Sequence, residues 1–170
     1  PFDLYGKTVL IIGFGRIGSR TARRCLAMDM NVIVYDPYKS AADIKAAGCE
    51  PVADLDAALP RAEFVTIHCP KTPETVGLFD ANRIGRMKPR SYLINTARGG
   101  IVKEAALYDA LVSGKLAGAG IDVFETEPAT ESPLFGLENV VCTPHLGAST
   151  SEAQENVALQ IAEQMADYLL

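Results

Sequence analysis

The chain of 170 residues has no tryptophan, only two histidines and four cysteines. The cysteines show no C-x-x-C spacing, which argues against a zinc site or a disulfide framework and favours reduced thiols in a cytoplasmic protein. The two histidines have no cluster of acids beside them, so we expect no metal site. No run of about twenty apolar residues is present, and the first residues do not resemble a secretory signal, so we expect neither membrane association nor export.

An excess of basic residues is also lacking. The sequence contains 16 Lys and Arg against 21 Asp and Glu, giving a net charge of −5. Binding to a nucleic acid backbone requires a basic face, so the balance argues against a nucleic-acid partner. The length and the absence of repeats or linkers predict one domain with a substantial core.

Short apolar runs alternate with segments of helical periodicity along the chain. The expected strands are residues 8–12, 32–35, 64–68, 92–95, 119–123 and 140–143. The expected helices are residues 16–28, 41–47, 55–59, 81–87, 104–112 and 151–170. This alternation predicts an α/β fold, a Rossmann-type doubly wound parallel sheet in a single domain. Ligands of such sheets bind outside the carboxyl ends of the strands, so the loops there are the candidate site.

The first strand leads into Gly13-Phe-Gly-Arg-Ile-Gly18, and the second ends at Asp36. Gly13 would permit the tight turn, Gly15 the approach of a pyrophosphate, and Gly18 the close packing of the helix. Asp36 can accept hydrogen bonds from a ribose diol and would repel a 2′-phosphate, which favours NAD over NADP, although Lys39 weakens that preference. The alternative is an ordinary strand–turn–helix without a ligand. The order of strand, turn, helix, strand and acid favours the nucleotide site.

Later strand ends carry charged residues that simple connections do not need. Arg98 follows the strand at 92–95, Glu125 and Glu127 follow that at 119–123, and His145 follows the last strand. An arginine can hold a carboxylate through two hydrogen bonds, a histidine can transfer a proton to a carbonyl oxygen, and an acid can fix its tautomer. Alternatively, the arginine is a surface ion-pair partner and the acids form a solvated loop. Their convergence behind a nucleotide motif favours hydride transfer to a keto acid.

Six segments carry a resemblance to a known family: Gly13-Phe-Gly-Arg-Ile-Gly18, Tyr35-Asp36-Pro37, His68-Cys-Pro70 with Thr75, Asn95-Thr-Ala-Arg-Gly-Gly100, Asp122-Val-Phe-Glu-Thr-Glu-Pro128 and Thr143-Pro-His-Leu-Gly-Ala148. In these segments, and over essentially its whole length, the chain resembles the cofactor domain of the D-isomer-specific 2-hydroxyacid dehydrogenases. The resemblance implies hydride exchange between NAD and a D-2-hydroxy acid. The resemblance is strongest to family members that act on 3-phosphoglycerate in serine biosynthesis. Glycerate, lactate and formate are the alternative substrates. A regulatory branch of the family implies another alternative, an NAD-sensing corepressor-like protein.

The resemblance also implies roles for individual residues. Arg98 would bind the substrate carboxylate, His145 would be the acid/base, and Glu127, rather than Glu125, would be the partner of the histidine. The implied cofactor-binding residues are Gly13, Gly15, Arg16, Ile17, Gly18, Asp36, Cys69, Pro70, Thr75, Thr96, Ala97, Arg98, Asp122, His145, Gly147 and Ala148. The family pattern further implies a homodimer formed through this domain.

The extent of the resemblance carries one more expectation. Family members have a second, substrate-binding domain, so residues 1–170 are expected to form the cofactor domain, with residues 1–6 and 150–170 as crossover segments to that domain. Without its second wall the cleft could not close and exclude water, so we expect the chain to bind NAD but to turn over poorly.

Overall fold

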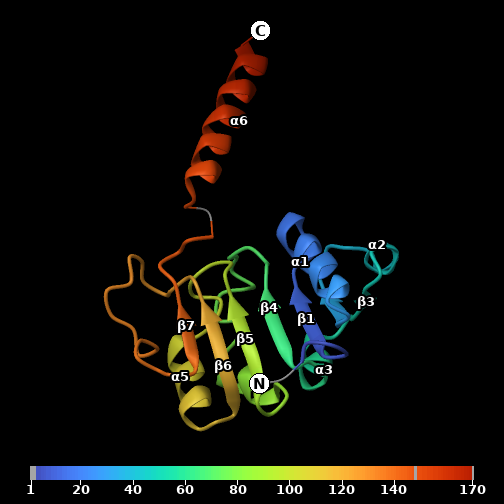
Figure 1. The fold of residues 1–170 in the computed structure, drawn as a ribbon, viewed down its shortest axis with the longest axis vertical. Helices are drawn as coiled ribbons and strands as arrows, with labels where there is room; N and C mark the ends of the chain where they lie inside the picture. The colour runs from blue at the N-terminus through green and yellow to red at the C-terminus, as the bar shows by residue number, and fades with distance from the viewer. Residues whose placement is uncertain (1–2, 148, 170) are drawn as a thin grey trace.

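The computed structural model describes residues 3–147 and 149–169, which form one seven-stranded sheet with helices on both faces (Figure 1). The strand order is β3-β2-β1-β4-β5-β6-β7, and every neighbouring pair is parallel. The strands are β1 (Thr8–Ile12), β2 (Asn31–Tyr35), β3 (Glu50–Pro51), β4 (Phe64–Ile67), β5 (Ser91–Asn95), β6 (Leu116–Ile121) and β7 (Val140–Cys142). The helices are α1 (Arg16–Ala27), α2 (Ala41–Ala46), α3 (Leu55–Ala58), α4 (Ala81–Arg86), α5 (Glu104–Val112) and α6 (Ser151–Leu169), with a 3-10 turn η1 at Leu59–Arg61. The predicted doubly wound fold is confirmed.

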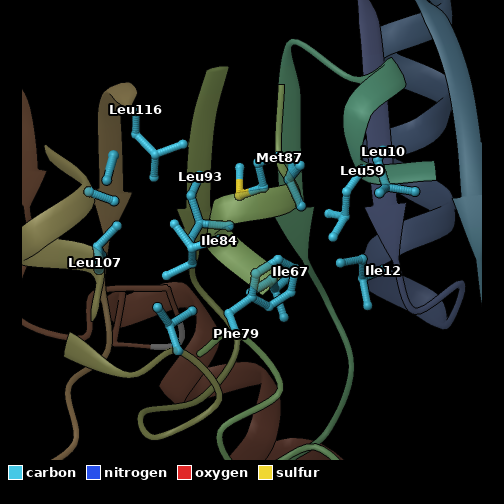
Figure 2. Packing of buried hydrophobic residues seen from close by; sticks show 14 of the residues in the cluster. Leu10, Ile12, Leu59, Ile67, Phe79, Ile84, Met87, Leu93, Leu107 and Leu116 are labelled. Atoms are coloured by element: carbon cyan, nitrogen blue, oxygen red, sulfur yellow. The ribbon is translucent and has the colours of Figure 1, made fainter. Parts of the chain in front are cut away.

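One face of the sheet carries the larger core. Side chains in register across the strands form a row made of Ile33, Leu10, Val65, Leu93, Ala119 and Val140. All but Val140 are buried, and Figure 2 shows part of this layer packed against residues of α4 and α5 and against Phe79. Burial of this continuous apolar layer is the main stabilising contribution to the fold.

The opposite face is covered unevenly. The row on this side contains Val34, Ile11, Thr66, Ile94, Gly120 and Val141. Helices α1 and α2 bury Val34 and Ile11 with Ala22, Cys25 and Ile44. Toward β7 the cover ends, and Val141 is 69% exposed.

Most predicted boundaries agree with the structure to within one residue, and two strands differ by more. Strand β3 was not predicted, because it has only two residues, one of which is proline, and pairs with β2 alone. Strand β6 begins at Leu116 rather than at 119 and ends before Asp122. The sequence Leu116-Ala-Gly-Ala-Gly-Ile121 lacks the β-branched residues that mark a strand until its last position, so its start was not recognisable.

Helix α6 extends away from the sheet (Figure 1). The hydroxyl of Thr150 accepts a hydrogen bond from the N–H of Ala153, so Thr150 is the N-cap. Val157, Ile161 and Met165 form an apolar stripe at helical spacing along α6, and each is more than half exposed. Leu170, where the predicted helix ends, lies outside the described residues. Among the helices that the structure describes, none is both long and apolar enough to cross a membrane.

Candidate functional site

The strand order reverses between β1 and β4, and three adjoining hollows follow the carboxyl edge of the sheet from there. The Gly13 hollow, of about 270 Å³, is lined by residues that include Gly13, Gly15 and Asp36. The Thr96 hollow, of about 390 Å³, includes Ile17, Thr96 and Ala97. The His145 hollow, of about 220 Å³, includes Glu127 and His145. His68, Cys69 and Pro70 line the first two hollows, while Lys71 and Arg98 line the last two, so the three form one track.

The glycine turn at the start of this track is dictated by the backbone. Gly13 has a φ of +91°, and a Cβ there would lie 2.8 Å from the amide nitrogen of Cys69. A Cβ on Gly18 would lie 2.0 Å from the carbonyl oxygen of Gly13. The expected tight turn and close helix packing are therefore confirmed. Gly15 is different, because the space around its missing Cβ is open, so packing within the chain does not require glycine there.

The N-terminus of α1 is suited to an anion. Its N-cap residue Gly15 provides no side-chain cap, and the first turn contains no acidic residue. The free N–H groups and the helix dipole at this end are therefore available to a phosphate. Together with the open space at Gly15, this geometry fits the pyrophosphate of a dinucleotide.

Asp36 is held rigidly at the far side of the Gly13 hollow. One carboxylate oxygen accepts a hydrogen bond from the N–H of Phe14 at 2.6 Å, and the other accepts one from the N–H of Tyr38 at 2.8 Å. A carboxylate has about four acceptor positions, so capacity remains for a ribose diol. These bonds also tie the end of β2 to the glycine turn.

The loop that follows β4 is closed by Thr75. Its hydroxyl accepts a hydrogen bond from the N–H of Thr72 and donates one to the carbonyl of Pro70, each at 2.7 Å. Pro70 and Cys69 line the hollow, as expected for cofactor contacts. The observed contacts of the Thr75 hydroxyl are within the loop, and a contact with the cofactor stays a prediction.

Arg98 is presented by a turn whose shape is fixed by its neighbours. The Asn95 side chain accepts a hydrogen bond from the N–H of Ala97 and donates one to the carbonyl of Arg98, both at 3.1 Å. A Cβ on Gly99 would lie 1.6 Å from the carbonyl oxygen of Phe124, so only glycine allows this contact. The Arg98 guanidinium donates to the carbonyl of Ala97 at 2.6 Å and lines both the Thr96 and His145 hollows.

His145 and Glu127 form a hydrogen-bonded pair at the end of the track. His145 Nδ1 lies 2.7 Å from Glu127 Oε2. Because an ionised carboxylate only accepts, Nδ1 carries the proton and Nε2 is left for a ligand. The other oxygen of Glu127 accepts from the N–H of Phe124 at 2.9 Å. The pKa of Glu127 is held below its usual value. The hydrogen bond from Phe124 is the largest cause, followed by the bond with His145 and by the positive charges of His145 and Arg98.

The segment that carries His145 is anchored on Asp122, which is buried. Asp122 accepts hydrogen bonds from the Thr143 hydroxyl at 2.5 Å, the N–H of Leu146 at 2.8 Å and the N–H of Gly147 at 3.0 Å. Burial would raise the pKa of Asp122, but these three bonds together lower it. The observed contacts of Asp122 and Gly147 position the loop, and their contact with the cofactor stays a prediction. Ala148 lies outside the described residues.

Glu125 has a structural partner of its own. It accepts a hydrogen bond from the N–H of Glu104 at 3.0 Å, and its own N–H donates to the Glu104 carboxylate at 2.6 Å. This reciprocal pair ties the loop to the start of α5. The expectation that Glu127, not Glu125, is the partner of the histidine is confirmed by geometry.

Sequence reasoning left some residues of the track unassigned. His68 lines two hollows with Nε2 at 3.0 Å from the Thr66 hydroxyl, and burial lowers its pKa. Lys71 lines two hollows as well. The signal for Lys71 was its place immediately after Pro70 at a strand end. Arg16 is exposed at the start of α1, between Gly15 and Ile17, and its contact with the cofactor stays a prediction. Within residues 3–147 and 149–169, no group of three or more His, Cys, Asp or Glu is placed to hold a metal ion.

Comparison with known proteins gives a consistent result. Residues 1–147 match the family described as "D-isomer specific 2-hydroxyacid dehydrogenase, NAD binding domain". The chain is 50% identical over 163 residues, 96% of its length, to D-3-phosphoglycerate dehydrogenase of Mycobacterium tuberculosis, and 44% identical over 168 residues to hydroxypyruvate reductase of Thermotoga maritima. Among solved structures, D-lactate dehydrogenase of Aquifex aeolicus, in complex with NAD and lactic acid, superposes with a TM-score of 0.88 at 35% identity over 99% of the chain.

The relatives are longer than this chain. The match covers 31% of the M. tuberculosis protein, 53% of the T. maritima protein and 55% of the A. aeolicus chain.

Proposed function

Since the chain belongs to the D-isomer-specific 2-hydroxyacid dehydrogenase family, as its NAD-binding domain, we propose that it serves hydride transfer between NAD and a D-2-hydroxy acid. The observation that carries the proposal is the His145–Glu127 pair at 2.7 Å, with Arg98 lining the same hollow. That hollow continues into the glycine turn and the uncapped helix that fit a dinucleotide.

Bound NAD(H) would supply or accept the hydride. His145 Nε2 would give a proton to the carbonyl oxygen of a 2-keto acid, and would take it back in the reverse direction. Glu127 would hold the imidazole in the required tautomer and balance the charge of its protonated form. Arg98 would hold the substrate carboxylate through two parallel hydrogen bonds, so that the carbonyl lies beside the imidazole.

We propose 3-phosphoglycerate, and in the reverse direction 3-phosphohydroxypyruvate, as the substrate. The support is the 50% identity to D-3-phosphoglycerate dehydrogenase, which extends over 96% of the chain. On its own, the domain presents this site openly: the side chains of His145 and Glu127 are 40% and 33% exposed. We therefore propose that residues 1–170 bind NAD(H) with little turnover.

The test is turnover of 3-phosphohydroxypyruvate with NADH by the gene product in its native length. His145→Ala should lower kcat by about 10²- to 10⁴-fold, the usual contribution of a general acid, while the Kd for NADH stays within about twofold. Glu127→Gln should also lower kcat, and Glu125→Gln, its matched control, should not. Equal losses of turnover and NADH affinity in His145→Ala would mean that His145 is structural. NADH binding without turnover of any 2-keto acid would favour a regulatory protein.

We also propose that the protein forms a homodimer through this domain. The support is the apolar surface beside β7, where Val141 is 69% exposed and Ile94 is only partly covered. Light scattering should give twice the chain mass, and Val141→Glu should give the monomer mass. Val112→Glu, at an exposed valine of α5, is the control and should leave the mass unchanged. A monomeric wild-type protein would contradict the proposal.

A further inference from the structure

Lys71 occupies a distinctive place at the junction of two hollows. It lines the Thr96 hollow together with Ile17 and Thr96, and the His145 hollow together with Glu127 and His145. Its ammonium lies against the backbone of Gly100, because a Cβ built on that glycine would be 3.0 Å from Lys71 Nζ. The ammonium is thus placed beside the turn that presents Arg98.

The two cations of the His145 hollow are not in ion-pair contact with the acids beside them. Over the part of the chain that the structure describes, neither Lys71 nor Arg98 has a carboxylate oxygen within 4.0 Å. The two acids lining the hollow are already engaged, Glu127 with His145 and Glu125 with the start of α5. The hollow is lined by these two carboxylates as well as by the two cations, but the carboxylates are held by other partners, so the remaining N–H donors of Lys71 and Arg98 suit a ligand with two separate anionic groups.

We propose that Lys71 is a specificity-determining residue, whose ammonium binds a phosphomonoester on a 2-keto acid or 2-hydroxy acid that Arg98 holds by its carboxylate. This inference rests on the proposed function and adds to it the residue that selects the substrate class. A lysine suits this role, because its ammonium acts as a point charge toward a phosphate, while the planar guanidinium of Arg98 matches a carboxylate.

The diphosphate of the cofactor is the other possible source of phosphate for Lys71. The uncapped N-terminus of α1, with an open approach at Gly15, would hold that group. The His145 hollow contains no helix N-terminus among its lining residues, so Lys71 and Arg98 are its sources of positive charge. We therefore assign the N-terminus of α1 to the diphosphate of the cofactor and Lys71 to the substrate.

The experiment compares 3-phosphohydroxypyruvate with hydroxypyruvate, which lacks the phosphate, as substrates of the native-length protein with NADH. Lys71→Met keeps the length of the side chain and removes the charge, and Lys71→Arg restores a cation. Lys45→Met, at an exposed lysine of α2, is the matched control. We expect Lys71→Met to lower kcat/KM for the phosphorylated substrate by about tenfold or more, mainly through KM. Turnover of hydroxypyruvate and the Kd for NADH should stay within about twofold, and Lys71→Arg should recover most of the loss.

Equal losses for both substrates with a raised Kd for NADH would overturn the inference and place Lys71 on the cofactor. An unchanged ratio of the two kcat/KM values would also overturn it and leave Lys71 a solvated lysine. Both of these outcomes leave the proposed function intact. If the wild-type protein binds NADH but reduces neither keto acid, 3-phosphoglycerate fails as the proposed substrate, and the role of Lys71 fails with it.

Discussion

The two ends of the ligand track are built in different ways. At the β1 end, the shape of the site comes from backbone: the φ of Gly13, the missing Cβ of Gly18 and the free N–H groups of α1. At the β7 end it comes from side chains, with His145 held by Glu127 and its loop held by Asp122. The first end offers backbone N–H groups that suit a diphosphate, while the second presents individual side chains with defined hydrogen-bond partners.

This difference determines how each end responds to substitution. A backbone site is disrupted by adding atoms where none fit, and is insensitive to most exposed side chains. A side-chain site is disrupted by removing atoms, while its surrounding backbone persists. Substitutions at the two ends therefore test the contrast, and they differ in the size of the effect that we expect.

Gly18→Ala should have the largest effect on stability. Its Cβ would lie 2.0 Å from the carbonyl oxygen of Gly13, so α1 would have to move away from the turn. We expect a loss of about 3 kcal/mol in the free energy of unfolding, measured by urea denaturation, and loss of NADH binding.

Gly15→Ala is the matched control for that substitution. The space around its Cβ is open, so the free energy of unfolding should change by less than about 1 kcal/mol. Its affinity for NADH should nevertheless fall, because the added methyl group stands where the pyrophosphate approaches. If Gly18→Ala were as stable as Gly15→Ala, the β1 end would not depend on backbone packing as described.

The β1 end was also the part that could be predicted best from the sequence. The glycine spacing, the strand before it and Asp36 after the next strand fix that geometry locally, within about 30 residues. At the β7 end the sequence placed Arg98, Glu127 and His145 at strand ends, and the fold then required them to meet. The anchoring of the loop by Asp122 and the pairing of Glu125 with Glu104 depend on contacts between distant segments, which no local pattern contains. The exposure of the apolar stripe on α6 could not be predicted either. A periodic apolar pattern indicates a helix face, but it does not show which part of the protein covers that face.

Asp122→Asn should have the next largest effect. An amide oxygen in the place of Oδ1 would keep the bonds from Thr143 and Leu146, but the NH₂ group would then oppose the N–H of Gly147; in the flipped orientation the NH₂ group would oppose the N–H of Leu146. We expect a loss of about 2 kcal/mol in the free energy of unfolding at neutral pH, and a lower kcat through displacement of His145.

The pH dependence provides a control for this prediction. The pKa of Asp122 is lower in the folded state, so its stabilisation is complete above the unfolded carboxyl pKa of about 3.9 and disappears as the pH falls through the folded value. Urea denaturation of the two proteins should therefore give curves that converge in acid. A constant difference down to pH ~2 would contradict the ionised state of Asp122.

Asp36→Ala tests the one side chain on which the β1 end depends. It removes the acceptor for the N–H groups of Phe14 and Tyr38 and the expected partner of the ribose diol. We expect the Kd for NADH to rise about tenfold and the preference over NADPH to narrow. Because the chain has no tryptophan, the fluorescence of the cofactor itself serves for the titration. An unchanged Kd and preference would remove Asp36 from the site.

Thr75→Val should have the smallest effect and separates shaping a loop from binding a ligand. The hydroxyl already accepts from the N–H of Thr72 and donates to the carbonyl of Pro70, so its loss should cost about 1 kcal/mol of stability. Because the neighbouring backbone of β4 remains in place, the Kd for NADH should rise by no more than about twofold. A tenfold rise with unchanged stability would mean that the hydroxyl binds the cofactor directly, and that the β1 end depends on side chains as much as the β7 end does.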